Sequence, residues 1–137
     1  MVGQLSREEI DALLGRLSIG RIGYCIDDRP RVVPVTYAFD GTDVYVASGP
    51  GQKIDAMRVQ PHVCFEIDEI NRSAIWRSVI ADGIYEELTN DRDRCAALAR
   101  ISEVLAAQTP CGADDSDDVI VFRIRLLEMT GRFGREL

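Results

Sequence analysis

Residues 31–53 have the sequence RVVPVTYAFDGTDVYVASGPGQK, and they carry the strongest structural signal in the chain. The runs 31–39 and 44–47 are rich in β-branched and aromatic residues, which favour strands. Asp40-Gly41 lies between them and is typical of a hairpin turn. Proline removes a donor from the ladder, so Pro34 predicts that the first of these strands is an edge strand or is bulged there. The segment therefore predicts two antiparallel strands followed by a glycine-rich loop.

Further elements are predicted on both sides of this segment. Apolar, β-prone runs predict strands at 22–26, 62–67, 74–88 and 119–126, with a kink at Gly83 in the third of these. Ser6 and Glu9 have the spacing of a capping box, which predicts a short opening helix that ends between residues 15 and 20. Helical spacing predicts two more helices at 54–59 and 91–107. Residues 114–118 are predicted to form an acidic loop, and residues 129–137 a tail.

This element order sets the fold class and the number of domains. Many short strands with few helices predict a mainly β protein, a six-stranded barrel that is closed mostly by antiparallel pairing and flanked by helices. The chain has 137 residues and shows no repeat or linker, so residues 1–137 are expected to form a single domain.

Composition excludes several classes of partner and site. The net charge of −7 argues against nucleic acid and anionic membranes as partners, because an acidic chain repels phosphate groups. No apolar run approaches the roughly 20 residues that span a bilayer, and no signal peptide is recognisable, so a cytoplasmic location is expected. The four cysteines form no C-x-x-C pair and there is one histidine, so no metal site is predicted. Cys25 and Cys64 lie in apolar runs and are expected in the core.

The loop Ser48-Gly-Pro-Gly-Gln-Lys53 is the best candidate for a binding site. It joins a predicted strand to a predicted helix, and free amides at a helix N-terminus favour an anion. Lys53 is the only lysine in the chain and adds a full positive charge. The alternative is a plain turn with a solvated lysine. Arg31 could join Lys53 in gripping a phosphate if the second predicted strand pairs with the third; otherwise it is a surface arginine.

The order of these motifs resembles one known family. Those that carry the resemblance are 31–37, Asp-Gly, 44–48, Gly-Gln-Lys53, 63–65, Trp76-Arg-Ser-Val79, Gly83 and Thr130-Gly-Arg132. Together they are similar to the pyridoxamine 5′-phosphate oxidase-like, FMN-binding split-barrel family, nearest to its small bacterial members of the nitroimidazole-resistance type. The resemblance extends from Ile19 to Arg132.

The resemblance implies a cofactor, its contacts and an assembly. It implies a homodimer with two FMN molecules at the interface and a small-molecule substrate or electron donor. The isoalloxazine ring would lie along the second strand and the phosphate at the glycine-rich loop, while the fifth strand would approach the flavin. The implied contact residues are Arg31, Val32, Val33, Pro34, Val35, Thr36, Ser48, Gln52, Lys53, Trp76 and Ser78. Trp76 could equally be a core or dimer-interface aromatic, and Tyr37 is expected to shape the pocket over the ring.

The implied activity is that of an FMN-dependent oxidoreductase, for which no catalytic residue is named because the flavin carries the chemistry. Where nitroimidazole-resistance members often have a histidine before the phosphate loop, this chain has Ala47, so chemistry that needs that histidine is not expected. The tail lacks the basic residues expected of a true pyridoxamine phosphate oxidase. Four alternatives stay open: a flavin carrier, a flavin sensor, a barrel that binds haem or a deazaflavin, and a barrel without a ligand.

Overall fold

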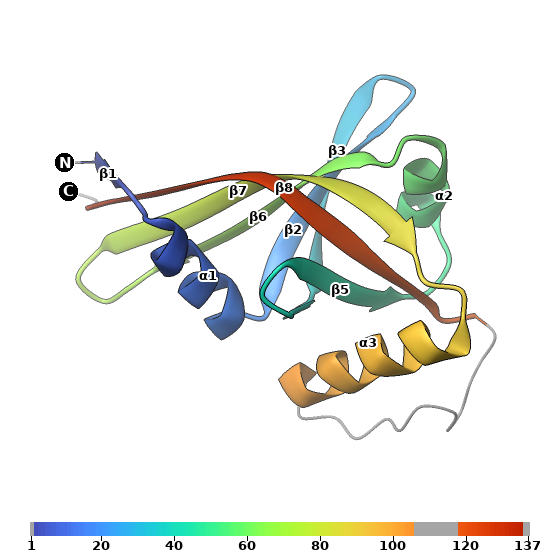
Figure 1. Ribbon diagram of the computed structural model, residues 1–137. Coiled ribbons are helices and arrows are strands. Elements are labelled where there is room, and N and C mark those ends of the chain that lie inside the picture. The colour runs from blue at the N-terminus through green and yellow to red at the C-terminus, as the bar shows by residue number, and fades with distance from the viewer. Residues whose placement is uncertain (1, 106–117, 136–137) are drawn as a thin grey trace.

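The computed structural model describes residues 2–105 and 118–135 as one curved, eight-stranded antiparallel sheet with three helices (Figure 1). The elements in chain order are β1 Val2–Gln4, α1 Arg7–Arg16, β2 Ile19–Ile26, β3 Arg29–Thr36, β4 Ala38–Phe39, β5 Asp43–Ser48, α2 Gln52–Val59, β6 His62–Ile70, β7 Ile75–Glu87, α3 Asp91–Leu105 and β8 Ile120–Arg135. The predicted acidic loop at 114–118 lies outside the described residues except for Asp118. No helix in the described ranges is long and apolar enough to cross a membrane.

The two end strands of the curved sheet follow each other directly along the chain. The strand order is β3-β2-β6-β7-β8-β5-β4, with β1 added to β8. The end strands β3 and β4 are separated along the chain only by Tyr37, whose backbone amide bonds to the Ser18 carbonyl at 2.9 Å. The predicted fold class, a mainly β barrel-type sheet with flanking helices, is confirmed, and two short strands, β1 and β4, are added to the six expected.

The pairing of the second predicted strand differs from the expectation. The run 31–39 was expected to be one strand, but it breaks at Tyr37 into β3 and β4. β3 pairs with β2 along its whole length, and only β4 pairs with β5. Pro34 lies in β3 at the end of the strand path, as its missing amide donor requires. The chain breaks here because Tyr37 turns inward and is fully buried.

One continuous core fills the inside of the curved sheet. Its largest fully buried side chains include Tyr37, Phe65 and Phe122. The first two rings pack edge to face with centroids 5.0 Å apart. Helix α1 covers the core with Ile10, Leu13 and Leu14, and α2 adds Ile54 and Met57. Each fully buried side chain of this size contributes about 1.5–3 kcal/mol.

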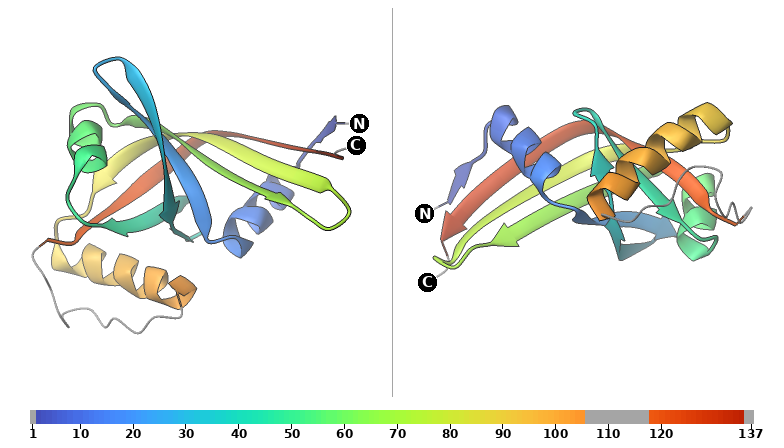
Figure 2. Two further views of the ribbon diagram at one scale, coloured as in Figure 1. Left: turned by 180° about the vertical axis from the view of Figure 1, so that it is seen from behind. Right: turned by 90° about the horizontal axis from the view of Figure 1, so that it is seen from below.

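The helices begin and end where local chemistry predicts. Ser6 caps α1 by accepting from the Glu9 amide at 3.2 Å, and the Glu9 carboxylate accepts from the Ser6 amide at 3.0 Å, which confirms the capping box. Helix α3 lies against the outer side of β5 and β8, where Ala97 packs with Leu88 and Val121 in a second small cluster (Figures 1 and 2).

The last two strands are long and span the molecule. β7 pairs with β8 from Ile75–Arg135 to Glu87–Phe122, with a register shift between Ala81 and Gly83 that confirms the predicted kink. Residues 129–135 were expected to be a tail, but they are strand and pair with both β7 and β1. Alternating polar and apolar residues there give a strand only because β7 supplies a partner.

Cys25 and Cys64 are exposed, so their expected place in the core was wrong. Side chains alternate between the two faces of a strand, and the buried residues of β2 and β6 are their neighbours Tyr24, Val63 and Phe65. The apolar runs identified the strands but not the face that each residue takes.

Candidate functional site

The glycine-rich loop ends in a helix N-terminus that is open to an anion. Helix α2 starts at Gln52 with Gly51 as its N-cap, and no side chain caps it. The first intrahelical bond runs from the Asp55 amide to the Gly51 carbonyl at 3.1 Å. The amides of the first turn precede it and therefore lack intrahelical acceptors. Lys53 is half-buried beside them, and no carboxylate of the described residues forms an ion pair with it.

A hollow of about 330 Å³ adjoins this helix end and gathers many of the predicted contact residues. Five of them line it: Pro34, Val35, Thr36, Ser48 and Lys53. Among the described residues, Lys53 is the only charged one in its lining. The Ser48 hydroxyl donates to the Gly49 carbonyl at 2.8 Å, so it must rotate to donate elsewhere. The hollow thus combines one cation, one hydroxyl and a short stretch of edge-strand backbone.

The other predicted residues of β3 and the loop lie outside this hollow. Arg31 pairs with Tyr24 of β2 and not with β5, so the pairing that would have brought it beside Lys53 does not form. Val32 and Val33 lie further along β3, with Val32 on the outer face. Gln52 lines a different groove, which begins at the same helix end. These four assignments stay predictions.

Trp76 and Ser78 lie on the outer face of the sheet, in the hairpin formed by β6 and β7. Trp76 is opposite Ile70 and its ring lies over Gly134, where a Cβ atom would be only 2.6 Å from the ring. Ser78 is opposite Asp68. Neither residue lines the hollow beside Lys53. The predicted contacts beside Lys53 and those on β7 therefore lie on separate parts of the chain.

That outer face combines exposed apolar side chains with a group of charged side chains. A shallow depression of about 470 Å³ is lined by Val32, Ile80 and Cys64 among others. Its lining also holds three charged residues, in which the Arg21 guanidinium contacts Glu66 at 3.1 Å and Asp68 at 2.7 Å. Burial raises the pKa of Glu66 to about 7, together with a hydrogen bond that protonated Glu66 donates to Asp68 and the negative charge of Asp68.

Tyr37 does not shape the pocket, because it is fully buried in the core and its hydroxyl donates to the Leu14 carbonyl at 2.8 Å. The expectation for this residue was wrong. The preceding residue, Thr36, lines the hollow, and Tyr37 does not.

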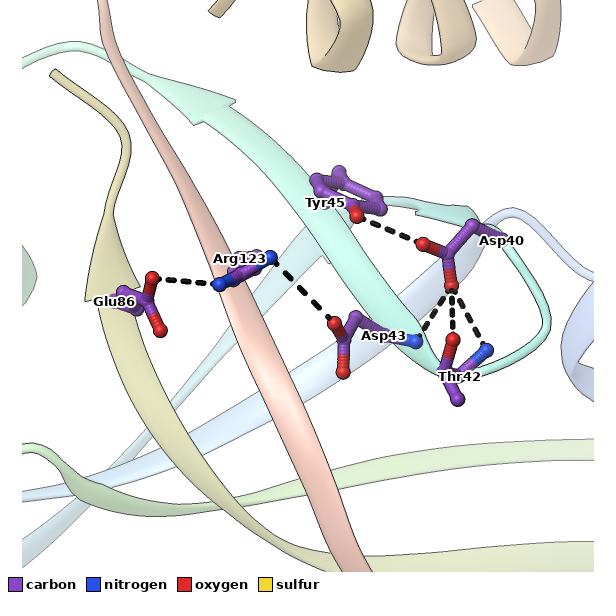
Figure 3. Close-up of polar contacts among 6 residues, drawn as sticks. All are labelled: Asp40, Thr42, Asp43, Tyr45, Glu86 and Arg123. Atoms are coloured by element: carbon purple, nitrogen blue, oxygen red, sulfur yellow. Dashed lines mark hydrogen bonds and ion pairs between the residues drawn. The ribbon is translucent and has the colours of Figure 1, made fainter. Parts of the chain in front are cut away.

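A cluster of polar side chains links β5, β7 and β8 near α3 (Figure 3). Arg123 of β8 donates to Glu86 at 2.7 Å and approaches Asp43 at 3.9 Å. Burial would raise the pKa of Asp40, but hydrogen bonds from Asp43, Tyr45 and Thr42 outweigh it and lower that pKa. The carboxylates are thus held by neighbouring groups, and the cluster braces the β4–β5 hairpin against β8 and β7.

Some lining residues had no sequence signal for binding. Helix α3 brings Ile101 and Leu105 to the hollow beside Lys53. Their i, i+4 spacing predicted only that they share one helix face.

A second and larger groove, of about 820 Å³, lies between α2 and the tip of the β2–β3 hairpin. It joins segments about 25 residues apart, so only the folded chain shows it.

The residues around the hollow fit the phosphate end of a nucleotide. A phosphate needs backbone amides, a cation and hydroxyl donors, and the open α2 N-terminus, Lys53 and Ser48 supply these. A flat ring system needs an edge with free backbone groups, which β3 offers because it pairs with β2 alone.

Comparisons with known proteins agree with this geometry. A sequence profile described as pyridoxamine 5′-phosphate oxidase matches residues 6–133. A crystal structure of an FAD-binding protein from Mesorhizobium loti is 33% identical, with a TM-score of 0.83 over 98% of this chain and 99% of that one. A protein from Bacteroides thetaiotaomicron with a suggested role in 5-nitroimidazole antibiotic resistance shares the fold, with a TM-score of 0.87 at 19% identity over 97% of this chain and 87% of that one.

An uncharacterised protein of Rhizobium meliloti is 43% identical over 84 residues, which are 61% of this chain and 56% of that protein. The chain thus matches little more than half the length of this curated relative. The profile match, in contrast, covers nearly the whole chain, from the capping serine of α1 to Phe133 near the end of β8. By that match, and by the likeness to the Mesorhizobium protein, the chain belongs to the pyridoxamine 5′-phosphate oxidase family.

Proposed function

We propose that this protein binds a flavin nucleotide, with the phosphate of its FMN moiety at Lys53 and the α2 N-terminus. The observation that carries the proposal is the 330 Å³ hollow, in which the edge strand β3, Ser48 and the only lysine of the chain meet. The Mesorhizobium relative, similar over its full length, is an FAD-binding protein, which supports a flavin as the ligand.

The proposed activity is that of a flavin-dependent oxidoreductase. The bound flavin would supply the electron or hydride transfer, and the protein would supply binding and orientation. Lys53 and the first-turn amides of α2 would hold the phosphate, and the backbone of Pro34–Thr36 would lie along the ring. No side chain beside the hollow is proposed as an acid or base, since Lys53 is the only titratable group that the described part of the chain contributes to its lining.

The proposed assembly is a homodimer in which a second copy covers the outer face of the β3-β2-β6-β7 part of the sheet. This face exposes Val32, Ile70 and Ile80 at 69%, 68% and 53% of their surfaces, and exposed apolar side chains grouped on one face typically mark an interface. The same face carries Trp76 and Ser78, which do not reach the hollow of their own protomer. A second copy would bring these two residues towards the first copy's edge strand β3.

The phosphate contact is tested by comparing FMN with riboflavin, which lacks the phosphate. Lys53→Ala is expected to weaken FMN about 10- to 100-fold, because a hydrogen bond to a charged group contributes about 1.5–3 kcal/mol. Riboflavin affinity should stay unchanged. Arg92→Ala, which removes an exposed cation from the start of α3, is the matched control and should leave both affinities unchanged. Equal losses for both ligands in Lys53→Ala would show that this lysine is not the phosphate anchor.

The redox activity is tested separately on protein loaded with flavin. Steady oxidation of a reduced nicotinamide, faster than with free flavin at the same concentration, is expected. A protein that binds flavin tightly but gives no sustained oxidation would be a carrier or sensor, and the oxidoreductase part of the proposal would be wrong.

A further inference from the structure

We propose that the 820 Å³ groove between α2 and the β2–β3 hairpin binds the adenosine half of a dinucleotide flavin, so that FAD and not FMN is the preferred ligand. The inference rests on the proposed function, because it extends the same ligand from the phosphate position past the helix end. Its volume lies within the range of small-molecule sites, about 300–1,000 Å³.

The groove starts where the proposed phosphate position ends. Gly51 and Gln52 line its near end and are the N-cap and first residue of α2, while Ser48 and Lys53 of the same loop line the hollow. From there the groove follows one face of the helix to Val59 and Gln60. Eight helical residues span about 12 Å, room for a nucleoside laid along the helix. A pyrophosphate over the first-turn amides would join the two halves.

Figure 1 shows the hairpin tip and α2 standing on the same side of the molecule, and Figure 2 shows them side by side from behind. The two elements make the opposite walls of the groove. Ile26 comes from the hairpin, and Ala56 and Val59 from the helix. Val59 is 86% exposed although it is apolar, so its side chain is available to pack against a purine ring.

The polar groups of the groove match a nucleoside and oppose a phosphate. The charged residues in its lining are Asp27, Asp28 and Asp55, and the described ranges 2–105 and 118–135 contribute no cation to it. Carboxylates accept hydrogen bonds from ribose hydroxyls, as the acidic residue of dinucleotide-binding folds does. The amides of Gln52 and Gln60 can both donate and accept at the edge of a base.

The two cavities therefore have opposite electrostatic character. Of the residues that the structure describes, Lys53 alone brings charge to the hollow, whereas the groove has three carboxylates. FAD carries its negative charge in the central pyrophosphate, between the flavin and the adenosine, so the pyrophosphate would lie beside Lys53 and the uncharged adenosine in the groove. The same carboxylates would reject a nucleotide that carries an extra phosphate on its ribose.

The experiment is equilibrium binding of FAD, FMN and riboflavin, measured by flavin fluorescence at fixed salt concentration. Wild-type protein is expected to bind FAD about tenfold more tightly than FMN, as one additional set of polar contacts would give. ADP-ribose, which has the dinucleotide end without a flavin, is expected to compete with FAD and not with riboflavin.

Two variants place the adenosine half. Asp27→Gly/Asp28→Gly removes two carboxylates, and glycine tolerates the turn because both residues have positive φ, 47° and 64°. Val59→Ser removes the exposed apolar wall. Each variant is expected to lose most of the FAD advantage and to keep its FMN affinity. The matched control Glu8→Gln/Asp11→Asn changes the net charge equally on α1 and should keep the wild-type ratio.

The outcomes separate this inference from the proposed function. Equal affinity of the wild type for FAD and FMN overturns the inference and leaves flavin binding intact. A preference for FAD that survives both variants overturns the groove as its cause. Absence of binding by any flavin overturns the proposed function itself, and the inference with it.

Discussion

Tyr37→Phe tests whether the buried hydroxyl at the break between β3 and β4 holds the end of α1. Tyr37 is fully buried, and its hydroxyl donates to the Leu14 carbonyl at 2.8 Å. Leu14 lies in the last turn of α1, where carbonyls lose their intrahelical donors, so the tyrosine takes the place of a missing amide. Phenylalanine keeps the ring and its edge contact with Phe65 and removes only the hydroxyl.

The expected cost follows from what the substitution leaves behind. A buried carbonyl without a donor costs about 1–3 kcal/mol. For a chain of 137 residues, each kcal/mol corresponds to a shift in melting temperature of roughly 3–6 °C. Urea unfolding at one fixed protein concentration should therefore show a lower midpoint at an unchanged slope.

Tyr45→Phe is the matched control. The Tyr45 hydroxyl donates to Asp40 at 2.7 Å, but this carboxylate is half-buried and keeps donors from Thr42 and Asp43 (Figure 3). Its loss is expected to cost less than about 1 kcal/mol. If Tyr37→Phe costs no more than Tyr45→Phe, the hydroxyl does not hold the helix end and the reasoning is refuted.

Three other perturbations address the sheet and its outer face. Ile80→Glu places a charge in the apolar outer face and is expected to convert the proposed dimer to monomer in light scattering; a wild-type monomer would remove the basis of this prediction. Glu66→Gln should gain stability relative to wild type as pH rises from 4.5 to about 7. Because the pKa of Glu66 is raised in the folded state, protonated Glu66 stabilises the wild-type fold at low pH, and this stabilisation is lost as the proton leaves. A difference in melting temperature between the two proteins that stays constant over this pH range would contradict the prediction. Gly83→Ala places a Cβ atom 2.4 Å from the buried Ile124 methyl and should cost about 1–3 kcal/mol. At Gly15 a Cβ atom would meet no described atom within 4 Å apart from its chain neighbours and the nearby helix backbone, so Gly15→Ala should stabilise α1 by up to about 1 kcal/mol. Similar effects of the two substitutions would contradict the packing argument.

Local sequence patterns predicted the elements of this protein well. The capping box fixed the start of α1, because it needs only residues three positions apart. The step from strand to glycine-rich loop to helix at 44–59 also came from adjacent residues. Five of the eleven predicted contact residues meet at one hollow: Ser48 and Lys53 belong to this step, and Pro34, Val35 and Thr36 belong to the edge strand β3.

Local patterns failed where a neighbour distant in sequence makes the choice. Cys25 and Cys64 lie in apolar runs yet face outward, since the pleat of the sheet decides which alternate residues are covered. The run 31–39 breaks at Tyr37, whose side chain is buried and donates a hydrogen bond to α1. Residues 129–135 become strand because β7 and β1 supply partners on both sides.

The sequence alone determined the fold class, the positions of most strands and helices, and the loop with the only lysine, because these depend on short-range propensity and hydrogen bonding. Tertiary structure decided which cavities exist and where the predicted contacts lie. It brought α3 to the hollow, separated Trp76 and Ser78 from Lys53, and opened the groove between α2 and the hairpin. Such features depend on how the sheet curls and pairs, which results from contacts between residues far apart in the chain.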